Sequence, residues 1–133
     1  MRNINQIIIH CTATKAGRKT TVSEIDRWHR ARGFRGIGYH YVIHLDGTVE
    51  RGRNESVAGA HCKGRNANSI GVCYVGGLDS GGKPADTRTP RQRKALVELV
   101  ATLRARYPGA TVHGHCEFAA KACPCFNVKA EFG

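Results

Sequence analysis

The sequence predicts one α/β domain that spans residues 1–133 and contains a mixed β-sheet. A length of 133 residues suits a single domain. Short apolar runs alternate with segments of helical periodicity, which is typical of α/β proteins. An Asp46-Gly47 pair between two β-prone runs indicates a hairpin, which supplies an antiparallel pair of strands.

The first predicted elements are a buried strand and a short helix. Residues 6–11 are apolar and largely β-branched, which favours a fully buried strand. Residues 21–29 predict the helix, with Ser23 as its N-cap and Gly33 as its stop signal. Ile25 and Trp28 are three positions apart, so we expect both to face the core.

The remaining elements are further strands and one long helix. Residues 39–45 and 48–51 are the predicted arms of the hairpin, and residues 69–75 form another apolar strand. A Gly- and Pro-containing surface loop follows at 79–89. The long helix begins at Thr89-Pro90 and ends at 107–109, before a last strand at 110–115. Its apolar face follows a three-to-four spacing and consists of Leu96, Leu99, Val100 and Leu103.

The chain carries a strong positive charge. Its 21 Lys and Arg residues against 10 Asp and Glu give a formal net charge of +11. Such a surplus attracts polyanions, which include nucleic acid, anionic membranes and acidic cell-wall polymers. The densest basic stretches are residues 27–32 and 88–94, and neither has a recognisable nucleic-acid-binding signature. Most of this charge is therefore interpreted as a solvated surface, and nucleic acid is not expected as a partner.

The N-terminal sequence favours synthesis in the cytoplasm. It has neither an apolar region of about 7–15 residues nor a cleavage site, and no run approaches the length of a membrane span. Membrane insertion is therefore not expected. In a reducing compartment, cysteines favour metal binding, catalysis or buried thiols over disulfides. The chain has six cysteines: Cys11, Cys62, Cys73, Cys116, Cys123 and Cys125.

Three of the candidate metal-binding side chains stand at the ends of predicted elements. His10 and His115 end two strands of the sheet, and Cys123 follows on a loop. Two imidazoles and a thiolate leave a fourth position open, which is the pattern of a catalytic zinc site. On spacing alone, a hydrogen-bonded core role is the more frequent one for a histidine on a strand. A metal site, part of a disulfide framework and a loop with buried thiols all remain open from the residues themselves.

Five segments of the chain, taken in order, form one pattern. They are residues 9–14 (IHCTAT), 38–41 (GYHY), 59–61 (GAH), 68–77 (NSIGVCYVGG) and 115–117 (HCE) followed by 121–124 (KACP). Together they resemble the type 2 N-acetylmuramoyl-L-alanine amidases, and most closely the small phage lysozymes that are amidases. The resemblance covers nearly the whole chain. It implies a central mixed sheet flanked by helices, a fold shared with the peptidoglycan recognition proteins.

The resemblance also implies the metal ligands. The family's zinc ligands fall on His10, His115 and Cys123, with one Zn²⁺ per chain. His115 is preferred to His113 because the family ligand stands two positions before a glutamate. Cys123 is preferred to Cys125 because the family ligand directly precedes a proline. Cys125 is then expected to be a bystander thiol in a loop.

Catalytic and substrate-binding roles are carried over in the same way. The family's catalytic tyrosine falls on Tyr39 and its catalytic lysine on Lys121. His61, on the loop ahead of residues 63–66, is expected either to line the substrate groove or to have a structural role in that loop. The other histidines considered, which are His29, His40 and His44, are interpreted as structural or exposed, and Cys11, Cys62, Cys73 and Cys116 as small buried hydrophobes.

The resulting hypothesis is a zinc-dependent amidase of the phage or prophage endolysin type, with residues 1–133 as a single catalytic domain. Its expected substrate is the amide bond between N-acetylmuramic acid and L-alanine in peptidoglycan. A monomer is expected, made in the bacterial host cytoplasm and acting on the wall after release. Two alternatives remain: a peptidoglycan-binding module without activity, and a basic protein with an intracellular nucleic-acid or protein partner.

Overall fold

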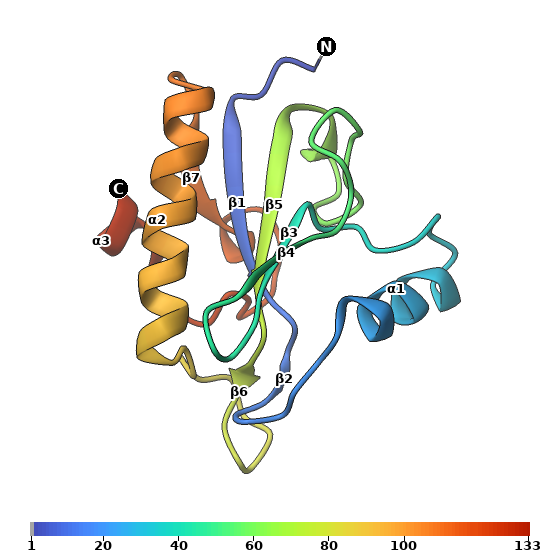
Figure 1. Cartoon of the computed structure of the whole chain (residues 1–133), viewed down its shortest axis with the longest axis vertical. Helices are drawn as coiled ribbons and strands as arrows, with labels where there is room; N and C mark the ends of the chain where they lie inside the picture. Colours follow the sequence, from blue (N-terminus) through green and yellow to red (C-terminus); the bar gives the residue numbers. More distant parts are fainter. Residues whose placement is uncertain (1) are drawn as a thin grey trace.

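A five-stranded mixed sheet forms the centre of the protein (Figure 1). The computed structural model describes residues 2–133. Strand order is β4-β3-β5-β1-β7; β3 and β4 are antiparallel, and the other neighbouring pairs are parallel. The predicted mixed sheet and its hairpin are therefore confirmed. The strands are β1 (Gln6–Cys11), β3 (Tyr41–Ile43), β4 (Val49–Arg51), β5 (Ser69–Tyr74) and β7 (Thr111–Gly114).

Helices flank this sheet, as expected. In Figure 1, α2 (Pro90–Arg106) runs along one side of the strands, and α1 (Val22–Ala31) lies at the opposite side of the molecule. Some elements were not predicted: the small parallel pair of strands β2 (Thr14–Lys15) and β6 (Gly77–Leu78), a 3₁₀ turn at Asn66–Asn68, and the C-terminal helix α3 (Val128–Phe132). Across residues 2–133, no helix combines the length and the apolar character that crossing a membrane requires.

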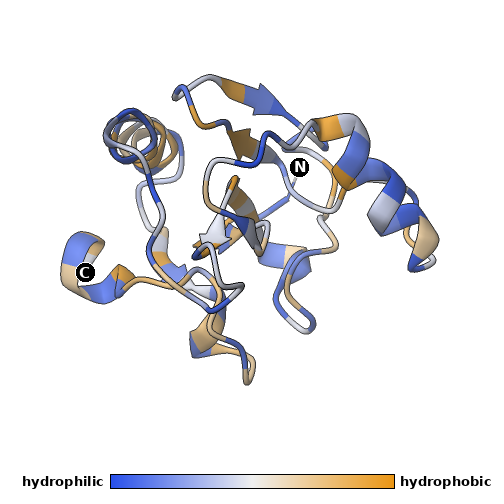
Figure 2. Ribbon diagram, turned by 90° about the horizontal axis from the view of Figure 1, so that it is seen from below, coloured by the Kyte–Doolittle hydropathy of each residue, from blue (hydrophilic) through white to orange (hydrophobic). Residues whose placement is uncertain are grey.

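The alternation of side chains along the strands gives the sheet two different faces. One face packs against the apolar stripe of α2, which appears in Figure 2 as orange segments turned toward the sheet. In β1, Ile7 and Ile9 belong to this core, so the side chain of His10 points to the opposite face. The same cluster contains Tyr41, Ile43, Ile70, Val72, Tyr74, Leu96, Val100, Leu103, Val112 and Val128.

The predicted start and inner face of α1 are both partly wrong. Its N-cap is Thr21, whose Oγ1 accepts from Glu24 N at 3.0 Å, while Glu24 Oε1 accepts from Thr21 N at 3.3 Å. This capping box places Ser23 inside the helix. Ile25 is buried, but Trp28 is 38% exposed. The core stripe continues instead four residues after Ile25, at His29, which is 6% exposed and accepts from Gly38 N at 2.7 Å.

Other boundaries differ from the prediction by one or two residues. The first hairpin strand covers only 41–43, so Tyr39 and His40 precede it. The last strand ends at Gly114, and His115 begins a 3₁₀ helix, His115–Glu117. In α2, Leu96, Val100 and Leu103 are buried as predicted, whereas Leu99 is only partly buried.

A buried arginine ties the C-terminal helix to the rest of the domain. The Arg88 side chain is 1% exposed and donates to Asp86 Oδ1 and to Glu131 Oε2, each at 2.9 Å. Its guanidinium carbon lies 3.4 Å from the ring centroid of Phe126. Arg88 therefore joins the segment before α2 to the C-terminal residues around α3.

We expect Arg88→Met to lower the free energy of unfolding by about 2–3 kcal/mol. Removing one partner of a buried ion pair costs about 3–5 kcal/mol, and here both carboxylates are partly solvated, which reduces the loss. Arg93→Met is the matched control, because Arg93 is 48% exposed and an exposed pair contributes about 0–1 kcal/mol. Urea denaturation of the three proteins measures the effect; equal midpoints for the two variants would contradict it.

Candidate metal centre and groove

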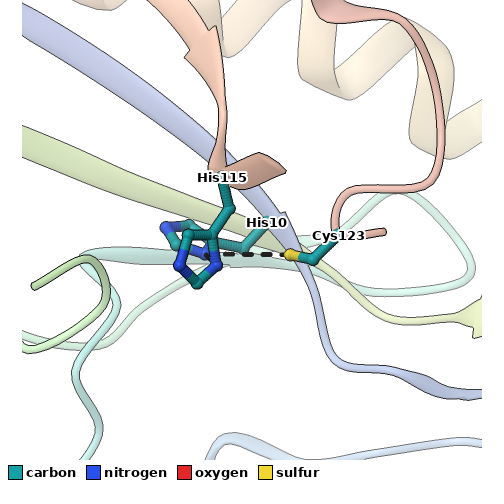
Figure 3. Close-up of side chains that lie close together, drawn as sticks. All are labelled: His10, His115 and Cys123. Carbon is teal, nitrogen blue, oxygen red and sulfur yellow. Dashed lines mark hydrogen bonds between the residues drawn. The ribbon is translucent and has the colours of Figure 1, made fainter. Parts of the chain in front are cut away.

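Two histidines and one cysteine converge on the face of the sheet opposite α2. His10 Nδ1 lies 3.1 Å from His115 Nδ1 and 3.9 Å from Cys123 Sγ. All three donor atoms lie within 4.8 Å of one another. Figure 3 shows the two imidazoles overlapping, with the sulfur of Cys123 pointing toward them. These are the three side chains that the resemblance selected as metal ligands.

Strand register explains why the two histidines meet. β1 and β7 are parallel, and Ile9 is paired with Gly114. His10, still within β1, and His115, directly after β7, therefore lie next to each other at the carboxyl ends of the two strands. The turn at His115 is fixed by Glu117, whose Oε2 accepts from Gly114 N at 2.8 Å.

Close approach of the backbone brings Cys123 to the same place. A Cβ on Gly114 would lie 2.9 Å from Pro124 Cδ, so glycine allows the two segments to pack together. Cys116 N donates to Cys123 O at 2.8 Å. Cys11 N donates to Cys123 Sγ at 3.2 Å, which aims the sulfur at the end of β1.

The two rival donors lie in other hydrogen-bond networks. His113 Nε2 lies 2.7 Å from Thr111 Oγ1, and its Nδ1 lies 2.8 Å from Glu117 Oε1. Cys125 Sγ lies 3.9 Å from Cys11 Sγ. Neither side chain is part of the three-donor cluster.

A groove of ≈640 Å³ opens over the cluster. Tyr39 and Lys121 line it together with His115 and Cys123. The ring centroid of Tyr39 lies 5.1 Å from that of His10, and Lys121 is exposed to solvent. The groove therefore brings a phenol and an ammonium to the cluster that could hold a metal.

Burial sets the protonation of these groups. It holds the pKa of His10 well below its usual 6.5, and the neighbouring His61 and His115 lower it further. Burial followed by the charge of Lys121 also lowers the pKa of His115. Neutral imidazoles are the form that binds metals. Burial raises the pKa of Tyr39 well above 10, so its phenol keeps its proton at neutral pH.

His61 also borders the groove but is only 8% exposed. Its Nδ1 lies 2.8 Å from His10 Nε2, and its Nε2 lies 3.2 Å from Ser69 Oγ. No pattern in the sequence predicts these contacts, because His10 and His61 are 51 positions apart and such a hydrogen bond leaves no local signal.

The other histidines and cysteines mostly follow the prediction. His29 and His40 are buried and His44 is partly buried, and each makes hydrogen bonds within the fold. The predicted buried positions of three cysteines are confirmed, but Cys116 is exposed because the 3₁₀ turn after β7 points it outward. The buried ones are Cys11, Cys62 and Cys73, and all six cysteines are free thiols.

The fold and this cluster define the class of the protein. Three nitrogen and sulfur donors beneath an open groove form a candidate catalytic metal centre of a hydrolase. The chain belongs to the N-acetylmuramoyl-L-alanine amidase family, whose model matches residues 1–126. It is an amidase of the phage endolysin type, and this family agrees with the one indicated by the five sequence segments.

Curated relatives and solved structures agree with this assignment. The chain is 50% identical to the endolysin of Escherichia phage T7 over 92% of its own length and 82% of the relative's. It is 46% identical to the endolysin of Klebsiella phage KP32, over 94% and 83% of the two chains. The N-acetylmuramoyl-L-alanine amidase LysC from Clostridium intestinale superposes with a TM-score of 0.84 at 32% identity, covering 98% of this chain and 85% of that one.

The likeness extends to the peptidoglycan recognition proteins at the level of the fold. Drosophila PGRP-LB superposes with a TM-score of 0.82 at 24% identity, over 98% of this chain and 80% of that chain. The expected fold shared by the two groups is therefore confirmed.

Proposed function

We propose that the protein binds one zinc ion through His10, His115 and Cys123 and hydrolyses peptidoglycan. The bond cleaved joins the lactoyl group of N-acetylmuramic acid to L-alanine. The observation that carries the proposal is the convergence of three donors, within 4.8 Å of one another, at an open groove of ≈640 Å³.

The chemistry of the donors fits zinc. Two imidazole nitrogens and a thiolate are typical zinc ligands, whereas magnesium and calcium prefer oxygen. A structural zinc site fills four positions with protein ligands, and the cluster here supplies three. A bound zinc ion supplies Lewis-acid polarisation of the scissile carbonyl and activation of a water molecule.

Lys121 and Tyr39 are proposed as the catalytic residues. The exposed ammonium of Lys121 reaches the groove from the segment that carries Cys123, and it stabilises negative charge on the carbonyl oxygen during attack. Tyr39 remains protonated, so it acts as a hydrogen-bond donor to the substrate or to the attacking water. His61 is proposed to line the same groove, at whose border it lies.

The domain organisation and the place of action follow from the same proposal. Residues 1–133 act as one catalytic domain and as a monomer, produced in the bacterial host cytoplasm and active on the wall after release. The net charge of +11 assists binding to an anionic wall polymer.

Digestion of purified peptidoglycan tests the proposal. We expect new free amino termini of alanine and no new reducing sugar ends. Exhaustive chelation is expected to abolish the release, and about one equivalent of zinc per chain to restore it. New reducing ends without free alanine amino groups would indicate a glycosidase, and full activity after verified metal removal would exclude zinc dependence.

A further inference from the structure

His61 links the candidate ligand His10 to the interior of the sheet. On one side of the His10 ring, Nδ1 faces His115 and Cys123 at 3.1 Å and 3.9 Å. On the other side, Nε2 lies 2.8 Å from His61 Nδ1. His61 Nε2 is 3.2 Å from the Oγ of Ser69, which is fully buried at the start of β5. Each ring nitrogen of His10 thus has its own partner.

The ring of His61 occupies a slot that two glycines create. A Cβ on Gly71 would lie 2.6 Å from both Cγ and Cδ2 of His61, and a Cβ on Gly59 would lie 2.5 Å from Cδ2. Either contact is too short for carbon atoms, so a side chain at either position would displace the imidazole. The ring therefore has little freedom to turn, and its two nitrogens stay directed at His10 and Ser69.

The direction of the hydrogen bonds follows from the need for a free lone pair on His10. A neutral imidazole carries one N–H, so a lone pair on Nδ1 requires the proton to be on Nε2. His10 Nε2–H then donates to His61 Nδ1, and His61 Nε2–H donates to Ser69 Oγ. The opposite arrangement would place the proton of His10 on Nδ1 and block that atom as a ligand.

We propose that His61 is a positioning residue, which with Ser69 holds His10 in the tautomer that presents Nδ1 to the metal. The inference rests on the proposed zinc site. Metal-binding histidines commonly donate their second N–H to a carboxylate, a backbone carbonyl or water, and here a second imidazole takes that place. Because both nitrogens of His61 are engaged inside the protein, its ring has no free polar atom for the substrate.

Zinc affinity of the purified protein tests this role. Titration against a chromophoric zinc chelator is expected to show that His61→Phe, which keeps a planar ring but no acceptor, weakens binding about 10- to 100-fold. His61→Asn should lose less zinc affinity than His61→Phe, because the side-chain oxygen of asparagine restores an acceptor near the position of Nδ1. His44→Phe is the matched control with unchanged affinity, because His44 pairs with Glu50 away from the groove.

The outcomes separate this inference from the proposed function. No zinc binding by the unaltered protein contradicts the proposed function, and the inference falls with it. Normal zinc binding by both the unaltered protein and His61→Phe overturns the inference alone. A raised KM of His61→Phe with unchanged zinc affinity also overturns it and assigns His61 to the substrate instead.

A measurement on the unaltered protein tests the proposed tautomer of His10 even if a variant does not fold. Long-range ¹H–¹⁵N correlation spectra of the metal-free protein report which nitrogen of each histidine carries the proton. We expect the proton of His10 on Nε2 and that of His61 on Nε2. A His10 ring protonated on Nδ1 would overturn the proposal.

Discussion

Cys123→Ser is expected to lose its bound zinc and its amidase activity. A serine hydroxyl is not deprotonated at neutral pH and is a far poorer ligand than a thiolate, so two imidazoles alone would hold the ion. Metal analysis of the purified variant, together with its activity on peptidoglycan, measures both effects. The loss is expected to be the largest of any single substitution considered for this protein.

Cys125→Ser is the matched control, because it makes the same chemical change two residues away. Cys125 Sγ lies near Cys11, outside the three-donor cluster. We therefore expect this variant to keep both zinc and activity. Zinc lost from the Cys125 variant and retained by the Cys123 variant would reverse the assignment of the ligand.

Lys121→Ala is expected to retain zinc but to turn over about 100- to 1000-fold more slowly, as is common when one oxyanion-stabilising group is removed. Tyr39→Phe should also keep zinc, and its turnover should fall about 100-fold or more, because the substitution removes only the hydrogen-bond donor. Turnover at saturating substrate, measured beside zinc content, separates a loss of chemistry from a loss of metal.

Two controls match these substitutions. Lys94→Ala removes an exposed ammonium on α2, and Tyr107→Phe removes a phenol hydroxyl that donates to Glu55, away from the groove. Both are expected to keep near-normal turnover. If Lys121→Ala or Tyr39→Phe behaves like its control, that residue has no catalytic role.

Much of the fold follows from local patterns in the sequence. Continuous β-branched residues predicted β1, the Asp46-Gly47 pair predicted the hairpin, and Thr89-Pro90 marked the start of α2. The short helix α3 was missed, because five residues carry too little periodicity and its position depends on the Arg88–Glu131 pair. Trp28 was placed wrongly because spacings of three and four residues both fit a helix, and only packing shows which one faces the core.

Only part of the candidate site was predictable from local patterns in the sequence. His10 and His115 could be paired because both were expected at strand ends, although β7 ends one residue earlier than predicted. Cys123 and Cys125 share one loop, and the choice between them depended on the family resemblance. The role of His61 depends on the packing of Gly59 and Gly71 around its ring, which no spacing in the sequence reveals.

X-ray absorption spectroscopy at the zinc edge of the zinc-loaded protein tests the central claim most directly. The proposed site predicts one sulfur at about 2.3 Å and two imidazole nitrogens at about 2.0–2.1 Å, with one further light-atom ligand. The sulfur contribution should vanish in Cys123→Ser and persist in Cys125→Ser. A first shell made only of nitrogen and oxygen in the unaltered protein would contradict the site formed by His10, His115 and Cys123.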